Sequence, residues 1–223
     1  MIKIAPSLAC ADFLHMEDEI RKFEKNNIDY IHYDICDTTF TNTIMLPIDL
    51  LKQIKDITKI PIDIHIMVRD PDEIVEKILP WLDENDIVSL QVESSDHYSN
   101  YLVKIKEKCK CGVVVNMGTG LDSIEYVAEL VDLVTLIQGN AGAGPRHNYP
   151  EIIGRKIEGV KEMMKRVGNN HCQISVDGNI NFTTAPIFKK YGANILVCGT
   201  KTLFTAGTQF DKQVKLLNEA LGQ

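Results

Sequence analysis

The sequence of 223 residues is poor in aromatic side chains and has no excess of positive charge. Aromatic residues make up 7% of the chain, and 24 basic residues stand against 31 acidic ones, so the formal net charge is −7. Non-specific binding to nucleic acid needs clustered lysine and arginine, so we expect no nucleic-acid partner. A phosphorylated small molecule stays compatible with this charge, because backbone N–H groups can hold a phosphate.

Long hydrophobic runs are also missing. No apolar stretch approaches the roughly 18 residues that a transmembrane helix needs. The apolar start of the chain is short and stops at Pro6, whereas a signal peptide needs a longer apolar core. We therefore expect a cytoplasmic protein with no membrane partner.

The six cysteines form no C-x-x-C pair, and their one close spacing is the C-x-C of Cys109 and Cys111. A tetrahedral zinc site would need two further ligands at matching spacing. Reduced thiols, as in other cytosolic proteins, are therefore the expected state of these cysteines.

Short apolar runs alternate with amphipathic helical patterns along the whole chain. The expected strands are 2–5, 30–34, 62–66, 87–92, 113–116, 133–136, 174–176 and 195–197. The expected helices are 16–26, 47–57, 71–82, 98–108, 122–130, 151–167, 183–191 and 211–221. Nearly continuous hydrophobic strands separated by helices are typical of a buried parallel sheet.

Eight strand–helix units in 223 residues fit a compact (β/α)8 TIM barrel. An open doubly wound sheet is the alternative, but no G-x-G-x-x-G follows the first expected strand. No linker-like segment divides the chain. We therefore predict one α/β domain, a barrel that spans residues 1–223.

Polar side chains gather where the expected strands end, which is where barrels of this kind carry their active sites. His32 and Asp34 alternate along the second strand and so share one face. His65 ends the third strand, and Asp177 ends the seventh. Each residue alone could be a structural histidine or a helix N-cap. Together, two histidines and two aspartates form a plausible ligand set for Zn²⁺ or a similar divalent ion.

Three glycine-containing loops follow the last three expected strands, at 139–145, 177–179 and 199–200. Glycine allows backbone N–H groups to approach an anion closely. Barrels of this kind commonly bind phosphate near strands seven and eight. Each glycine could also be an ordinary turn residue, but three such loops at adjacent strand ends predict a phosphate site.

The order and spacing of these motifs resemble the ribulose-phosphate 3-epimerase family over nearly the whole chain. The matching segments are IAPSL at 4–8, ADF at 11–13, IHYDICD at 31–37, DIHIMV at 63–68, SVDGNI at 175–180 and GANILVCGT at 192–200. The resemblance implies a (β/α)8 barrel with one divalent metal ion. It also implies an isomerase of carbohydrate metabolism that acts in the pentose phosphate pathway.

The same resemblance implies a role for each matching residue. His32, Asp34, His65 and Asp177 would bind the metal ion, with zinc expected first and iron, manganese or cobalt as alternatives. Asp34 and Asp177 would also be the acid–base pair that exchanges the C3 proton of a 2-ketose on opposite faces, through a metal-stabilised enediolate. The expected substrate-binding residues are Ser7, His65, Met67, Gly142, Ala143, Gly144, Pro145, Gly178, Asn179, Gly199 and Thr200.

Several positions depart from the family pattern. Gly144-Pro145 replaces a double glycine, and Pro145 has no N–H to offer a phosphate, a loss for which Arg146 or His147 would compensate. Asn179 replaces the second glycine after the seventh strand, and Gln91 stands where a histidine is usual. The predicted metal and acid–base residues are all present, so the expected reaction type is unchanged.

The interpretation that follows is 3-epimerisation of a phosphorylated ketose, first of all D-ribulose 5-phosphate to D-xylulose 5-phosphate. D-allulose 6-phosphate or another ketose phosphate is the alternative substrate, because the altered positions lie in the substrate loops. A barrel that binds a sugar phosphate without turning it over is a second alternative, and a metal-independent isomerase or lyase is a third. Relatives form dimers and hexamers, so we expect a homo-oligomer.

Overall fold

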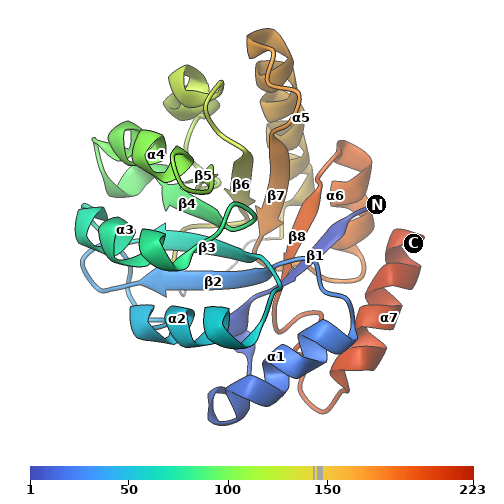
Figure 1. Cartoon of the computed structure of the whole chain (residues 1–223). Coiled ribbons are helices and arrows are strands. Elements are labelled where there is room, and N and C mark those ends of the chain that lie inside the picture. Colours follow the sequence, from blue (N-terminus) through green and yellow to red (C-terminus); the bar gives the residue numbers. More distant parts are fainter. Residues whose placement is uncertain (143, 145–147) are drawn as a thin grey trace.

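The computed structural model describes residues 1–142, 144 and 148–223, which form a ring of strands surrounded by helices (Figure 1). The strands are β1 (Lys3–Pro6), β2 (Ile31–Cys36), β3 (Ile62–Met67), β4 (Ile87–Gln91), β5 (Lys110–Val115), β6 (Leu133–Ile137), β7 (Gln173–Asp177) and β8 (Ile195–Cys198). In these described residues they make one parallel sheet in the order β1-β8-β7-β6-β5-β4-β3-β2. A bridge between Ser7 and His32 brings β1 back to β2, so the predicted (β/α)8 barrel is confirmed.

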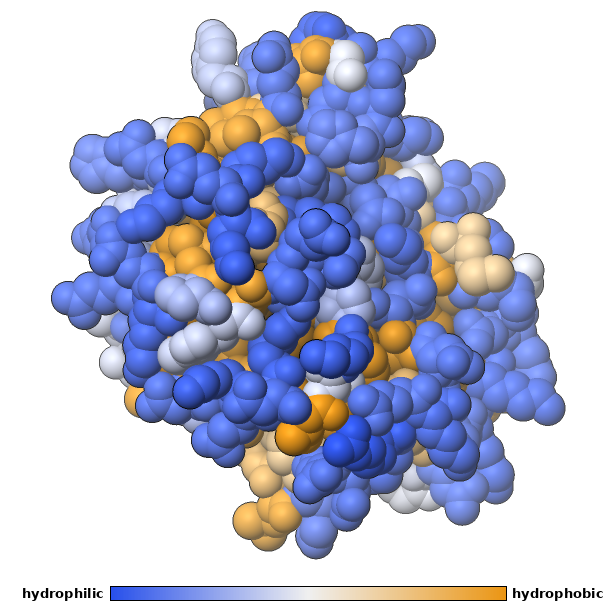
Figure 2. Space-filling view, viewed as in Figure 1, coloured by the Kyte–Doolittle hydropathy of each residue, from blue (hydrophilic) through white to orange (hydrophobic). Residues whose placement is uncertain are grey.

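Helices follow the strands and cover the outside of the ring (Figure 1). The α-helices of the described ranges are α1 (Met16–Lys25), α2 (Ile48–Ile57), α3 (Asp72–Ile78), α4 (Tyr98–Lys106), α5 (Pro150–Val167), α6 (Thr184–Tyr191) and α7 (Phe210–Leu221). Short 3-10 helices extend the connections at η1 (Leu8–Cys10), η2 (Phe13–His15), η3 (Leu79–Trp81) and η4 (Val92–Ser94). The face seen in Figure 2 is mainly hydrophilic, because the apolar sides of the helices pack inward. No helix in the described part of the chain has the length and apolar character to cross a membrane.

The helix predicted at 122–130 is wrong in type, because the chain forms the 3-10 helix η5 (Leu121–Val127) there. Apolar residues recur every third position, at Leu121, Ile124 and Val127. Side chains three residues apart eclipse one another in a 3-10 helix, which has three residues per turn. This spacing therefore puts one apolar edge on the barrel without an α-helix, and Ile124 is fully buried there.

Two hydrophobic clusters divide the core. The larger one lies between strands and helices. The smaller one contains Ala5, Tyr30, Ile87, Leu133 and Ile195. Ile87 pairs with Asp63, which pairs with His32, and paired residues of adjacent strands share a face. The smaller cluster thus fills the barrel interior at the N-terminal ends of the strands, below the polar residues of the opposite end.

Four repeated side-chain contacts, which we call the N-terminal clasps, join the strands in pairs. In each clasp, a side-chain oxygen just before an even-numbered strand accepts the backbone N–H at the start of the preceding strand. The contacts are Ile4 N to Asp29 (2.9 Å), Ile62 N to Asp86 (2.8 Å), Cys111 N to Asp132 (2.9 Å) and Ile174 N to Asn194 (2.8 Å). The clasps satisfy buried backbone donors, which helps to fix the strand register.

Candidate active site

A cavity of about 490 Å³ lies at the C-terminal ends of the strands. Most of the predicted catalytic and substrate-binding residues line it: Ser7, Asp34, Met67, Gly142, Gly144, Asp177, Gly178, Asn179, Gly199 and Thr200. The barrel therefore brings together residues that are far apart in the sequence. Four residues named above, Ala143, Pro145, Arg146 and His147, lie outside the described residues.

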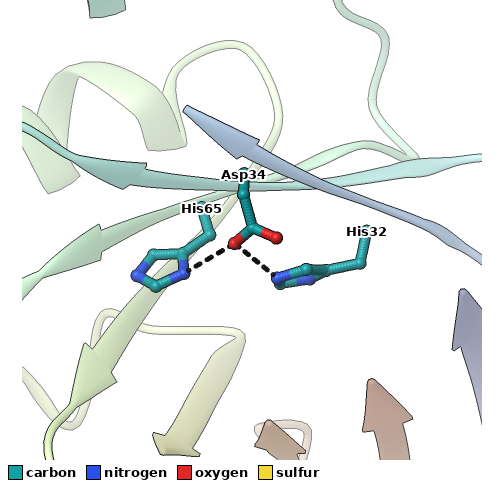
Figure 3. A group of neighbouring side chains, drawn as sticks. All are labelled: His32, Asp34 and His65. Atoms are coloured by element: carbon teal, nitrogen blue, oxygen red, sulfur yellow. Dashed lines mark hydrogen bonds and ion pairs between the residues drawn. The ribbon is translucent and has the colours of Figure 1, made fainter. Parts of the chain in front are cut away.

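His32, Asp34 and His65 form a buried group beside this cavity. Figure 3 shows the two imidazoles on either side of the Asp34 carboxylate, both directed at the same oxygen. The Oδ1 atom of Asp34 lies 3.2 Å from Nε2 of His32 and 3.3 Å from Nδ1 of His65. Three ligand atoms, one from each residue, all lie within 4.8 Å of one another. This close grouping confirms that the predicted residues of β2 and β3 converge.

Each imidazole is held from behind by a different partner. His32 Nδ1 lies 2.8 Å from a carboxylate oxygen of Asp63, and His65 Nε2 lies 2.9 Å from the amide oxygen of Gln91. Both acceptors are buried, and an acceptor oxygen requires the ring nitrogen to donate. The other ring nitrogens, Nε2 of His32 and Nδ1 of His65, are the ones that face Asp34.

The charges around Asp34 favour its ionised form. Burial alone would raise the pKa of Asp34, but the charge and hydrogen bond of the His32 imidazole outweigh burial and hold that pKa well below its ordinary value. Burial would lower the pKa of His32, yet the carboxylates of Asp34 and Asp63 raise it well above its usual range. Positive charge is thus stabilised between these residues.

The arrangement fits a divalent cation. Nδ1 of His65 is buried and makes no hydrogen bond within the described residues, and it lies 3.3 Å from Oδ1 of Asp34. Two imidazole nitrogens and a carboxylate oxygen are common ligands of zinc and related metals. Within the described ranges, no other group of His, Cys, Asp and Glu side chains is close enough to bind a metal in this way.

Asp177 lines the same cavity from the end of β7 and is partly buried. Its carboxylate is not one of the three groups that lie within 4.8 Å of one another. The Asp34 carboxylate accepts a hydrogen bond from the Ser7 hydroxyl (3.2 Å). Two carboxylates therefore face the same cavity. The Asp34 carboxylate lies between the two imidazoles, and the Asp177 carboxylate lies apart from them.

Comparison with known proteins agrees with this geometry. The model of the ribulose-phosphate 3 epimerase family matches residues 3–203. The chain is 35% identical to a ribulose-phosphate 3-epimerase of Bacillus subtilis, over 90% of this chain and 91% of that protein. It is 33% identical to one of Methanocaldococcus jannaschii, over 90% and 83% of the two chains. The chain belongs to the ribulose-phosphate 3-epimerase family. It is therefore an isomerase of carbohydrate metabolism, as the motifs indicated.

Solved structures of low sequence identity share the barrel. A ligand complex of KGPDC from Streptococcus mutans has a TM-score of 0.74 at 11% identity, over 99% of this chain and 97% of that one. A mutant tryptophan synthase alpha-subunit from Pyrococcus furiosus has a TM-score of 0.68 at 14% identity, with both chains fully covered. These similarities establish the fold alone.

The backbone conformation of two substrate loops accounts for the residues found there. Gly142 has a φ of +85°, and a Cβ there would lie 2.7 Å from Cβ of Thr41, so only glycine fits. Gly178 and Asn179 both have positive φ, at 90° and 52°. Asparagine is among the few non-glycine residues that adopt this conformation readily. The departure from the family glycine at Asn179 therefore leaves the backbone shape attainable.

Several residues of the site are not among those that the sequence singles out. Cys10, Met45 and Lys201 also line the cavity. Burial raises the pKa of the Cys10 thiol, and the nearby carboxylates of Asp34 and Asp177 add to this effect, so its neutral thiol is favoured. Lys201 follows Gly199 and Thr200 directly and adds a cation to this edge of the cavity.

Proposed function

We propose that this family member interconverts the C3 epimers of a phosphorylated ketose, with D-ribulose 5-phosphate and D-xylulose 5-phosphate as the substrate pair. The observation that carries the proposal is the pairing of the His32–Asp34–His65 group with a second carboxylate, Asp177, at one cavity. Inversion at a carbon next to a carbonyl requires a proton to leave on one face and a proton to arrive on the other. Two carboxylates that face one space supply these two proton positions.

We assign the proton transfers to Asp34 and Asp177. In one direction, a carboxylate oxygen of Asp34 takes the C3 proton and Asp177 returns a proton from the opposite face. In the other direction the roles reverse. Ser7 orients Asp34 through its hydrogen bond to Oδ2. Met67 forms part of the wall, and its sulfur accepts the backbone N–H of Gly142 at 3.3 Å, which ties this wall to the loop after β6.

The residues present also fit a divalent metal ion, which His32, Asp34 and His65 would hold, with Asp177 as the proposed fourth ligand. When bound, such an ion supplies positive charge that stabilises the negative charge developing on the substrate oxygens. Zinc is the first choice for this ligand set, and iron, manganese and cobalt share its preferences. The chain's own residues fix the site beforehand, because both imidazoles are already held by Asp63 and Gln91.

We place the substrate phosphate at the ends of β7 and β8. Gly178, Asn179, Gly199 and Thr200 line the cavity there, and backbone N–H groups of such loops suit a phosphate in this fold. Lys201 adds a positive charge at the same edge. A net charge of −7 therefore does not prevent an anion from binding, because the local groups differ from the average.

The test is a parallel assay with D-ribulose 5-phosphate, D-allulose 6-phosphate and unphosphorylated D-ribulose in D₂O. We expect deuterium at C3 of D-ribulose 5-phosphate, with product formed at a comparable rate, and complete loss of both after metal removal by a chelator. Faster exchange with D-allulose 6-phosphate would reassign the substrate. Binding without any exchange would contradict catalysis, and full activity after verified metal removal would contradict the metal requirement.

The predicted homo-oligomer of two or six chains and the cytoplasmic location remain predictions.

A further inference from the structure

Two side chains in series hold His65: Gln91 contacts the imidazole, and Glu93 contacts Gln91. The amide oxygen of Gln91 accepts from Nε2 of His65 at 2.9 Å. The amide nitrogen of Gln91 donates to Oε2 of Glu93, which stands two residues further on. Gln91 is fully buried, so both ends of its amide are committed to these contacts. His32, by contrast, is held directly by the Asp63 carboxylate.

The direction of this chain follows from Glu93. An ionised carboxylate can only accept hydrogen bonds, so the Gln91 amide must turn its NH₂ group toward Glu93. Its oxygen then faces His65, and Nε2 of His65 must carry the proton. The lone pair of Nδ1 is thereby left toward Asp34, where that nitrogen makes no hydrogen bond within the described residues.

We propose that Glu93 and Gln91 are positioning residues that hold His65 as its Nε2–H tautomer, with Nδ1 free to bind a cation. This inference rests on the proposed function only in taking His65 as a metal ligand. It extends the site by a residue that does not line the cavity. Partners of this kind, which orient a metal ligand from behind, typically change metal affinity by about 10–100-fold when mutated.

Glu93 is itself fixed by the loop after β5. Its Oε1 accepts the backbone N–H of Asn116 (2.9 Å) and the hydroxyl of Thr119. The ammonium group of Lys156 on α5 donates to the backbone carbonyls of Asn116 (2.7 Å) and Thr119 (2.7 Å). Asn116 Oδ1 in turn accepts the N–H of Ala141 (2.7 Å). The tautomer of His65 is thus tied to the loop that carries Gly142.

The same logic explains why Gln91 can stand where a histidine is usual in the family. A neutral imidazole and a primary amide each offer an acceptor on one side and a donor on the other. Either group can therefore accept from His65 and donate to Glu93. A residue that lacks either the acceptor or the donor would interrupt the hydrogen bonds that link His65 to Glu93.

The test uses nitrogen-15 spectra of the metal-free protein, at a pH at which His65 is neutral, to read which ring nitrogen is protonated. We expect wild-type His65 to be Nε2–H. In Glu93→Gln, the new amide oxygen must face Asn116 and Thr119, so its NH₂ faces Gln91 and the Gln91 amide turns over. His65 should then become Nδ1–H, with zinc affinity reduced about 10–100-fold.

A compensating variant checks that the effect is one of hydrogen-bond direction. Gln91→Glu combined with Glu93→Gln again places an acceptor at His65 and a donor between the two residues, so it should restore the Nε2–H tautomer. Thr119→Val removes one donor to Glu93 without touching Gln91 and should leave the tautomer unchanged. His32, held by Asp63, is the internal reference in every spectrum.

An Nδ1–H form in the wild type, or an unchanged Nε2–H form in Glu93→Gln, would overturn the inference. The outcome is separable from that of the proposed function. A reversed tautomer in Glu93→Gln, with no C3 exchange by the wild type, would retain the positioning role and reject the epimerase. Normal exchange by the wild type, with zinc affinity and tautomer unchanged in Glu93→Gln, would retain the epimerase and reject the positioning role.

Discussion

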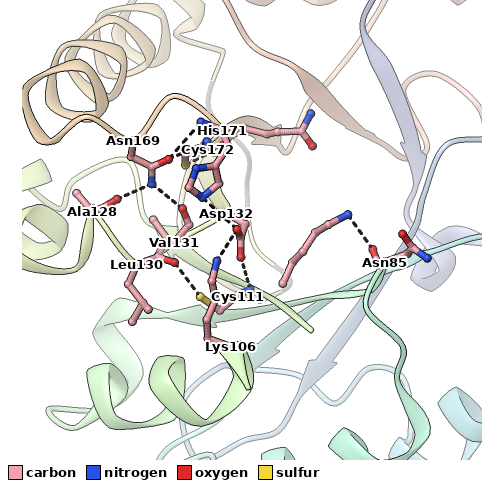
Figure 4. A network of polar contacts seen from close by, with 12 residues as sticks. Asn85, Lys106, Cys111, Ala128, Leu130, Val131, Asp132, Asn169, His171 and Cys172 are labelled. Atoms are coloured by element: carbon pink, nitrogen blue, oxygen red, sulfur yellow. Dashed lines mark hydrogen bonds and ion pairs between the residues drawn. The ribbon is translucent and has the colours of Figure 1, made fainter. Parts of the chain in front are cut away.

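The two ends of the barrel hold the same kinds of side chain but use them differently. At the N-terminal end, Asp132 accepts hydrogen bonds from the backbone N–H of Cys111 (2.9 Å) and from the ammonium group of Lys106 (2.6 Å). Nε2 of His171 lies 3.3 Å from the same carboxylate. Asn169 donates to the backbone carbonyls of Ala128 and Val131 at 2.7 and 2.8 Å. Figure 4 shows that these contacts run mostly between side chains and backbone. At the C-terminal end, Asp34 and the two imidazoles face one another instead.

The comparison shows that composition alone does not make a site. Aspartate, histidine and cysteine also meet around Asp132, where burial raises the pKa of Cys111 to about 11 and that of Cys172 to about 12. Neutral thiols of this kind are poor ligands and poor nucleophiles. The polar atoms there are used by neighbouring strands and loops, which is the stabilising role expected at this face of a barrel. Around Asp34, a ring nitrogen is left without a hydrogen bond among the residues that the structure describes, and a cavity adjoins it.

The largest loss of activity is expected when one carboxylate at the C-terminal end is neutralised. We expect Asp34→Asn and Asp177→Asn each to reduce turnover by about 10²–10⁴-fold, because each removes one of the two proton-transfer groups. Urea unfolding should show a cooperatively folded protein in both cases. Near-normal turnover in either variant would reject its assignment as an acid–base residue.

Substitution of a buried aspartate at the N-terminal end, Asp86, should instead reduce stability and leave turnover unchanged. Asp86 is fully buried, accepts the N–H groups of Ile62 and Asp83 (both 2.8 Å) and pairs with Lys55 (2.7 Å). We expect Asp86→Ala to lower the free energy of unfolding by about 3 kcal/mol, since two N–H groups lose their acceptor. Lys55 loses one of its two carboxylate partners and keeps Asp83 (2.7 Å). Turnover per folded molecule should be unchanged.

A conservative variant separates charge from hydrogen bonding in that clasp. Asn194 fills the equivalent place before β8 with a neutral amide, so an amide can make the contact to the backbone. Asp86→Asn should therefore cost less, about 1–2 kcal/mol. Equal losses in the two variants would show that the ion pair with Lys55, rather than the clasp, dominates.

The barrel and the His32–Asp34–His65 group could be predicted because their sequence signals are local. Buried strands show as apolar runs, and the period-two alternation of His32 and Asp34 places both on one face. The strand ends then position Asp177 without any knowledge of contacts. In contrast, the pattern at 122–130 predicts an α-helix where η5 forms, since apolar residues at every third position occur in both helix types.

The supporting residues could not be found in this way, because their partners are distant in the sequence. Asp86 stands in a loop, where an aspartate has many ordinary roles, and its clasp partner Ile62 is 24 residues away. Gln91 departs from the family pattern, but its contacts to His65 and Glu93 appear only once the strands are paired. Lys201 carries no distinct signal, because a lysine after a strand is usually solvated.

Lys201 offers a smaller test of the C-terminal end. If it contacts the phosphate, Lys201→Met should raise KM for the phosphorylated ketose about tenfold, the equivalent of about 1.4 kcal/mol, with little change in kcat. Lys212→Met removes an exposed lysine of α7 and serves as the matched control for the loss of one positive charge. Steady-state kinetics of both variants decide the matter, and equal KM values would place the phosphate elsewhere.

The smallest effect is expected from His171, at the N-terminal end. Its side chain is 61% exposed and lies 3.3 Å from Asp132, whose carboxylate is already bound by Lys106 and the backbone of Cys111. Exposed pairs of this kind contribute about 0–1 kcal/mol, so His171→Gln should change the free energy of unfolding by less than about 0.5 kcal/mol and leave turnover intact. Its backbone N–H contact with Asn169 survives the substitution. A larger loss in urea unfolding would mean that Asp132 depends on His171, and that the contacts at this end are less redundant than their number implies.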